Sequence, residues 1–93
     1  MKPLVVPVPN LNGNSAESLQ EQLTNIRQAL NAALAAFSKA SDCIHGRNFQ
    51  TMLDGISYQR MAQEAWYERV TALEAMASEI YQIQIQIQKG QNS

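Results

Sequence analysis

The chain has few of the residues on which cysteine-rich, metal-binding and membrane proteins depend. Cys43 is its one cysteine, which excludes an internal disulfide and a cysteine-rich zinc site and favours a reducing compartment. His45 is its one histidine, so a histidine-based metal site would need carboxylates or symmetry copies as its other ligands. We therefore predict no metal and no cofactor. No apolar run approaches the roughly 18 residues that a membrane span needs, so we expect no membrane partner.

Charged residues are scarce as well, at 16% of the 93 residues. Seven Lys and Arg against eight Asp and Glu give a net charge of −1, which argues against a protein that binds duplex DNA. The N-terminus carries one Lys and then several prolines, and it does not resemble a signal peptide. Because 45% of the residues are hydrophobic, the chain can fold, and we expect one small cytoplasmic domain.

The sequence also lacks the motifs of common enzymes. It contains no phosphate-binding glycine loop, no dinucleotide fingerprint and no His-Glu-x-x-His pair. Glu64 and Glu68 lie one helical turn apart without a histidine partner, which is typical of a solvated helix surface. Cys43 and His45 lie two positions apart, and we interpret them as a small buried cysteine beside a histidine at a helix end. We therefore predict that the chain is not an enzyme.

The first 14 residues differ in composition from those that follow. Prolines alternate with β-branched and other apolar residues over positions 3–9, and proline both fixes φ and removes a backbone donor. Residues 1–14 are therefore predicted to form an extended arm. Turn-forming residues lead into the next segment, where either Asn14 or Ser15 can cap a helix. With Asn14 as the cap, Glu17 would stand at the capping-box position.

Two amphipathic helices are predicted, over about residues 16–42 and 57–88. Apolar residues of the first are spaced alternately four and three apart: Leu19, Leu23, Ile26, Leu30, Ala33 and Phe37. Gly46 can take the left-handed conformation that often ends a helix. Residues 83–88 alternate Ile with Gln, which is typical of a strand, although the helical seam also continues through them. Both interpretations stay open at this point, and the helix is favoured.

A connector of about ten residues should fold the two helices into an antiparallel hairpin. A hairpin buries only the strip where its two seams meet, and Leu34, Met76 and Ile85 widen the apolar surface beyond that strip. One core of this size rarely supplies more than about 3–5 kcal/mol of stability. We therefore predict an all-α chain, with the arm at 1–14 and a hairpin domain at 15–93, that assembles into a homo-oligomeric helical bundle.

Two polar clusters are candidate ligand sites. The first lies where free backbone N–H groups at a helix start favour an anion, and it comprises Asn12, Gly13 and Ser15. The second combines a cation, an amide and an aromatic ring in the connector, and it comprises His45, Arg47, Asn48 and Phe49. Trp66 and Arg69 lie near the second cluster along the second helix. A helix cap, a solvated loop and a core tryptophan are the ordinary explanations of these residues.

Because the helices are long, the two clusters are expected at opposite ends of one hairpin. In an antiparallel dimer or a ring, the helix start of one subunit can reach the connector of another. We therefore predict a shared pocket between copies, suited to a small anionic ligand.

The two short motifs resemble those of a group of small phage and prophage proteins, which read approximately Leu-Asn-Gly-Thr-Ser and His-Gly-Arg-Asp-Tyr. The matching segments here are Leu11-Asn12-Gly13-Asn14-Ser15 and His45-Gly46-Arg47-Asn48-Phe49. Asn14 stands in place of a threonine, Asn48 of an aspartate and Phe49 of a tyrosine, which affects any role that needs the carboxylate or the phenol. Small helical oligomers of phages include sponges that sequester the cyclic nucleotide or cyclic ADP-ribose messengers of bacterial immunity, and the resemblance implies work in the host cytoplasm.

Two functions follow as hypotheses. The first is a sponge that binds a nucleotide-derived messenger through the shared pocket. The second is a protein-interaction module, either a phage assembly factor or an inhibitor of a host protein, that docks through the arm or the Ile-rich C-terminus. A sponge requires Arg47 to converge with donors from another subunit, whereas an interaction module leaves Arg47 solvated and exposes a contiguous apolar patch.

Overall fold

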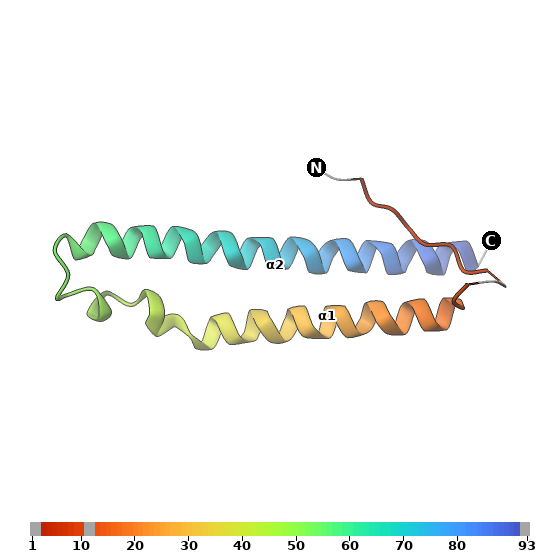
Figure 1. Cartoon of the computed structure of the whole chain (residues 1–93), viewed down its shortest axis with the longest axis horizontal. Helices are drawn as coiled ribbons and strands as arrows, with labels where there is room; N and C mark the ends of the chain where they lie inside the picture. Colours follow the sequence, from red (N-terminus) through yellow and green to blue (C-terminus); the bar gives the residue numbers. More distant parts are fainter. Residues whose placement is uncertain (1–2, 11–12, 92–93) are drawn as a thin grey trace.

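Two helices of unequal length lie side by side in the computed structural model, which describes residues 3–10 and 13–91. Helix α1 spans Ala16–Lys39 and α2 spans Gly55–Gln91. The connector holds two short 3₁₀ helices, η1 at Ser41–Ile44 and η2 at Gly46–Asn48. The two long helices run antiparallel (Figure 1). The described residues contain no strand, so the prediction of an all-α hairpin is confirmed.

Helix α1 begins at a serine cap. Ser15 has extended backbone angles, φ −69° and ψ 162°, and its side chain accepts a hydrogen bond from the Ser18 N–H at 3.1 Å. The Asn14 side chain instead donates to the Ser18 hydroxyl at 3.1 Å. Ser15 is therefore the cap, and the alternative in which Asn14 caps and Glu17 completes a capping box is wrong. Glu17 still lies in the first turn, where its charge complements the helix dipole.

The end of α1 differs from the prediction. The helix stops at Lys39 rather than near residue 42, because the Ala40 N–H is shared between the Ala36 and Phe37 carbonyls and the chain then tightens into η1. Gly46 does not take a left-handed conformation; within residues 3–10 and 13–91 the residue with positive φ is Asp54, at 57°. Aspartate tolerates this region because its short polar side chain can bond locally. Cys43 is exposed, so the prediction of a buried cysteine is also wrong.

Helix α2 is longer than predicted at both ends. It begins at Gly55 instead of residue 57 and continues through Gly90. Residues 83–88 are helical, which resolves the ambiguity of the Ile–Gln alternation. A strand there would need a neighbouring strand to satisfy its backbone, and the helix satisfies its own. An added side-chain carbon at Gly55 would collide with the Phe49 carbonyl oxygen, so glycine allows the connector to approach the start of α2 closely.

Residues 3–10 form neither helix nor strand, and they run back along the C-terminal end of α2 (Figure 1). Val6, Pro7 and Pro9 line a hollow together with Ile87 of α2. Ile87 is the one buried hydrophobic residue of the described part of the chain, at 3% exposure. The division of the chain into an arm at 1–14 and a domain at 15–93 stays a prediction.

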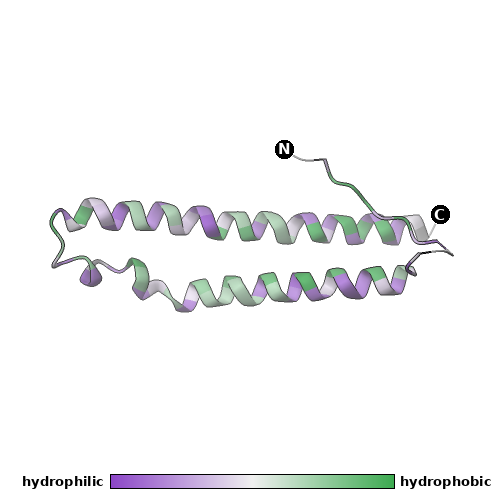
Figure 2. Cartoon of the chain, in the orientation of Figure 1, coloured by the Kyte–Doolittle hydropathy of each residue, from purple (hydrophilic) through white to green (hydrophobic). Residues whose placement is uncertain are grey.

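The hairpin is a thin rod. It measures 62 × 25 × 20 Å, and its radius of gyration is 19.2 Å, whereas a compact domain of this length would have about 12 Å. Apolar and polar residues are interspersed along both helices (Figure 2). Neither described helix is both long and apolar enough to cross a membrane. A single hairpin therefore buries very little of its apolar surface.

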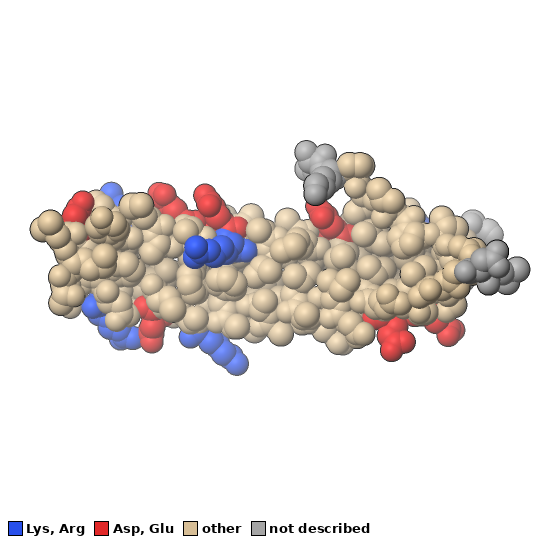
Figure 3. Space-filling model, in the orientation of Figure 1, with Lys and Arg blue, Asp and Glu red and all other residues tan. Residues whose placement is uncertain are grey.

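The two broad faces of the rod differ in chemistry. Helical spacing puts small and apolar residues of both helices on one face, which we call the alanine face. Its apolar and small members are Ile26, Ala29, Ala33, Ala36 and Ala40 of α1 and Ala62, Ala65, Ala72 and Met76 of α2. The same spacing places one exposed cation, Arg69, among the α2 members. The opposite face carries Gln20, Arg27, Tyr81, Gln84 and Gln88, and we call it the glutamine face. In the space-filling view, charged side chains gather mainly along the outer edges of the two helices (Figure 3).

Candidate functional site

The connector cluster predicted from sequence is brought together by the structure. The Arg47 backbone N–H donates to Nδ1 of His45 at 3.2 Å, and the Arg47 guanidinium forms an ion pair with Asp42 at 2.6 Å. The Asn48 amide donates to the Asp42 carbonyl oxygen at 2.6 Å. Phe49 is half-buried beside them. These residues thus bond to one another and to Asp42, which holds the connector in its folded path.

The other predicted site residues lie elsewhere. Gly13 and Ser15 are at the opposite end of the rod from the connector, where the Gly13 N–H donates to the Asn10 carbonyl at 3.3 Å. Asn12 lies outside the described residues. Within one chain the two clusters are therefore not joined, as expected from the helix lengths. The pocket shared between copies stays a prediction.

Trp66 and Arg69 lie one turn apart on α2 but differ in their surroundings. The Trp66 ring meets the Phe37 ring edge to face, with centroids 4.8 Å apart, so Trp66 packs between the two helices. Arg69 is exposed. The interpretation of Trp66 as a packing residue therefore fits the structure better than a ligand platform.

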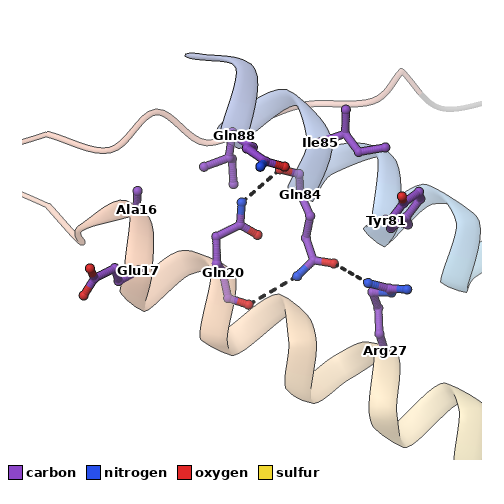
Figure 4. Close-up of a pocket in the computed structure, with 9 residues that line it drawn as sticks. Ala16, Glu17, Gln20, Arg27, Tyr81, Gln84, Ile85 and Gln88 are labelled. Atoms are coloured by element: carbon purple, nitrogen blue, oxygen red, sulfur yellow. Dashed lines mark hydrogen bonds between the residues drawn. The ribbon is translucent and has the colours of Figure 1, made fainter. Parts of the chain in front are cut away.

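A second candidate site, which the sequence did not reveal, lies on the glutamine face. Its centre is the Gln84 side chain, which reaches from α2 to α1 (Figure 4). The side-chain amide nitrogen of Gln84 donates to the backbone carbonyl of Gln20 at 3.3 Å and to the Thr24 hydroxyl at 3.0 Å. The side-chain oxygen of Gln84 accepts from Nη1 of Arg27 at 2.9 Å. The Gln20 amide in turn donates to the Gln84 carbonyl at 2.9 Å. Four hydrogen bonds thus join the helices around one residue.

Arg27 and Tyr81 extend this network toward solvent. The Arg27 guanidinium lies over the Tyr81 ring, 4.7 Å from its centroid, which is a cation–π contact. Beside them a groove of about 480 Å³ opens between the helices. Its lining comprises Ala16, Glu17, Gln20, Arg27, Tyr81, Gln84, Ile85, Ile87 and Gln88. We call it the Arg27 groove.

One signal in the sequence could have indicated this groove. Gln20 and Arg27 are seven residues apart and stand next to the apolar seam of α1, so they share one edge of it. A cation beside the apolar seam of a helix is unusual, and it predicts a hydrogen-bonding or charged partner on the facing helix. The partner, Gln84, lies in the Ile–Gln segment, and only the pairing of the helices identifies it.

We expect replacement of Gln84 by Ala to lower the free energy of unfolding by about 1–2 kcal/mol, because the half-buried Gln20 carbonyl and Arg27 guanidinium lose their hydrogen bonds to it. Urea denaturation followed by circular dichroism measures this change. Gln82→Ala is the matched control, since Gln82 is exposed on the same helix, and it should change stability by less than about 0.5 kcal/mol. Equal effects of the two variants would contradict the importance of the Gln84 network.

Neither site contains a metal centre. Among residues 3–10 and 13–91, no group of three or more His, Cys, Asp or Glu side chains could hold a metal ion. Comparison of the chain with protein-family models, with curated proteins and with solved structures finds no match. The function must therefore be argued from the two faces and the connector alone.

Proposed function

We propose that the chain is a non-enzymatic protein-interaction module that works as a homo-oligomer, with the alanine face as the surface between its copies. The observation that carries this proposal is the exposed area of the single hairpin. Its accessible surface is 7265 Å², whereas a compact protein of 10.4 kDa exposes about 5,400 Å². The excess of about 1,900 Å² is the amount that one partner buries in an obligate interface.

The alanine face suits a second copy of itself. Ala33, Ala36 and Ala40 line a hollow of about 290 Å³ together with Phe37 and Trp66. On the same face Ile26 and Met76 project, and each is 45% exposed. A two-fold axis would place the projecting side chains of each copy against the small residues of the other. Such mutual packing makes an interface self-complementary. Two hairpins packed in this way form a four-helix bundle.

The charge of the connector favours the same proposal. Arg47 is 56% exposed on its side chain, and Asp42 already neutralises its charge. A sponge for a phosphorylated messenger would need this guanidinium free to bind the ligand. An interaction module needs only a folded connector and an exposed apolar surface, which the small and apolar residues of the alanine face provide on either side of Arg69.

Sequestration of a nucleotide-derived messenger is the second candidate. One observation supports it, namely that His45, Arg47 and Asn48 lie together in the connector. The ligand would have to displace Asp42 from Arg47, and donors from another copy would complete the pocket. Under either function we propose a phage-type protein that works in the host cytoplasm, a reducing compartment in which the exposed thiol of Cys43 is stable.

Thermal melting distinguishes the two functions. For an oligomeric interaction module, the melting temperature should rise with protein concentration, because association stabilises the folded state by mass action. Cyclic dinucleotides and ADP-ribose isomers should leave it unchanged. A sponge predicts instead a stabilisation of roughly 2.7 kcal/mol at a ligand concentration 100 times the dissociation constant. A melting temperature that is independent of protein concentration and raised by a nucleotide would overturn the proposal.

A further inference from the structure

The guanidinium of Arg27 lines the Arg27 groove without forming an ion pair to any described carboxylate. Among residues 3–10 and 13–91 the one ion pair joins Arg47 to Asp42, so no carboxylate of the described chain pairs with Arg27. Arg27 is nevertheless half-buried between the helices. A guanidinium removed in part from water is stabilised when a carboxylate or phosphate pairs with it.

The guanidinium of Arg27 is fixed in position and still has donors to spare. One of its five N–H groups donates to Gln84 through Nη1, and the plane of the group lies over Tyr81. These two contacts hold the guanidinium at the edge of the groove (Figure 4). A guanidinium that is already held in position loses little conformational entropy when two of its N–H groups bind the two oxygens of a planar anion.

We infer that the Arg27 groove binds a ligand through one carboxylate group. The carboxylate accepts from the unused N–H donors of Arg27, and the amide of Gln88 lies along the same groove wall as a further donor. Ala16 and Ile85 provide an apolar surface for the adjoining part of the ligand. The volume of about 480 Å³ is within the range of small-molecule sites, and it also admits an acidic side chain of a peptide.

The apolar lining favours an organic acid over inorganic phosphate, because phosphate has no apolar part to contact Ala16 and Ile85. Glu17 lines the far end of the groove, ten residues or about 15 Å along α1 from Arg27, too far to pair with its guanidinium. This inference does not depend on the interaction module proposed above, since the groove lies on the glutamine face and stays outside an interface built on the alanine face.

Nuclear magnetic resonance on the full chain tests the inference. The ¹H–¹⁵N signal of the Arg27 Nε–H is followed while acetate, the capped glutamate N-acetyl-Glu-amide, inorganic phosphate or chloride is added at constant ionic strength. We expect saturable shifts with acetate and with the capped glutamate, in the millimolar range for a single forked contact. The tighter of the two identifies the source of the carboxylate, a free acid or a protein side chain. Phosphate should bind more weakly, and chloride should produce no saturable shift.

Three variants sharpen the test. Arg27→Gln should abolish the carboxylate response, which is then read from the backbone amides of Gln84 and Ile85, while circular dichroism verifies that the helices are retained. Arg69→Gln is the matched control, because Arg69 is exposed, and it should bind acetate like the unchanged chain. Glu17→Gln removes a carboxylate about 15 Å along α1 from Arg27, and it should change acetate binding by less than about twofold. The inference is overturned if chloride shifts the Arg27 signal as acetate does, if phosphate binds more tightly than either carboxylate, or if Arg27→Gln keeps the carboxylate response.

Discussion

Replacement of Met76 by Glu should convert the oligomer into single hairpins. Met76 is only half-exposed in one chain and lies at the C-terminal end of the α2 part of the alanine face, where a second copy packed on this face would cover it. An unpaired carboxylate buried in an apolar interface costs several kcal/mol. A loss of about 3 kcal/mol or more weakens association by more than about a hundredfold. Size-exclusion chromatography with light scattering at about 20 μM should therefore report a mass near 10.4 kDa.

Two further variants make this prediction specific to the alanine face. Gln63→Glu adds the same charge to an exposed position on the other side of α2, and it should leave the mass unchanged. Met76→Leu conserves volume and hydrophobicity, and it should also leave the oligomer intact. A Met76→Glu protein that keeps the mass of the unchanged chain would contradict the assignment of this face to self-association.

Replacement of Trp66 by Ala should produce the largest loss of stability within the hairpin. The edge-to-face contact with Phe37 joins the helices near the connector. Removal of a well-packed tryptophan costs about 3–5 kcal/mol, and because Trp66 is only half-buried we expect about 2–3 kcal/mol. For a domain of this size that corresponds to a decrease of roughly 10–20 °C in the melting temperature.

Tyr67 is the matched control for this variant. It is the next residue on α2 and is 73% exposed, so Tyr67→Ala removes an aromatic ring of similar size from a solvated position. We expect a change of less than about 0.5 kcal/mol. If Tyr67→Ala destabilised the protein as much as Trp66→Ala, the contact between Phe37 and Trp66 would not be what joins this end of the hairpin.

The helices were predictable because their signals are local. Ser15 can accept a hydrogen bond from the backbone N–H three residues after it, which indicates the start of α1. The apolar spacing from Leu19 to Phe37 indicates the helix that follows. The end of α1 was less predictable, because several weak helix formers after Lys39 allow an α-turn and a 3₁₀ turn at nearly equal cost. The Ile–Gln segment was ambiguous for a different reason, since its pattern fits two periods and only the contact with α1 favours one of them.

The two candidate sites also differ in how far their residues are separated in the sequence. His45, Arg47 and Asn48 lie within a few residues of one another, so sequence alone indicated that they cluster, although not that Asp42 neutralises the arginine. The Arg27 groove depends on hydrogen bonds between residues about 60 positions apart, such as Gln84 and Thr24. Which glutamine meets which turn of α1 is determined by the register of the two helices, and no local pattern specifies that register.

Sedimentation equilibrium of the unchanged chain tests the central claim most directly. The account holds that copies of the chain cover the alanine face of one another. Between about 1 and 100 μM the weight-average mass should therefore rise toward an integral multiple of 10.4 kDa, and it should be at least about twice that value at the upper end of the range. A folded, helical protein that sediments as a single species of 10.4 kDa throughout would contradict it.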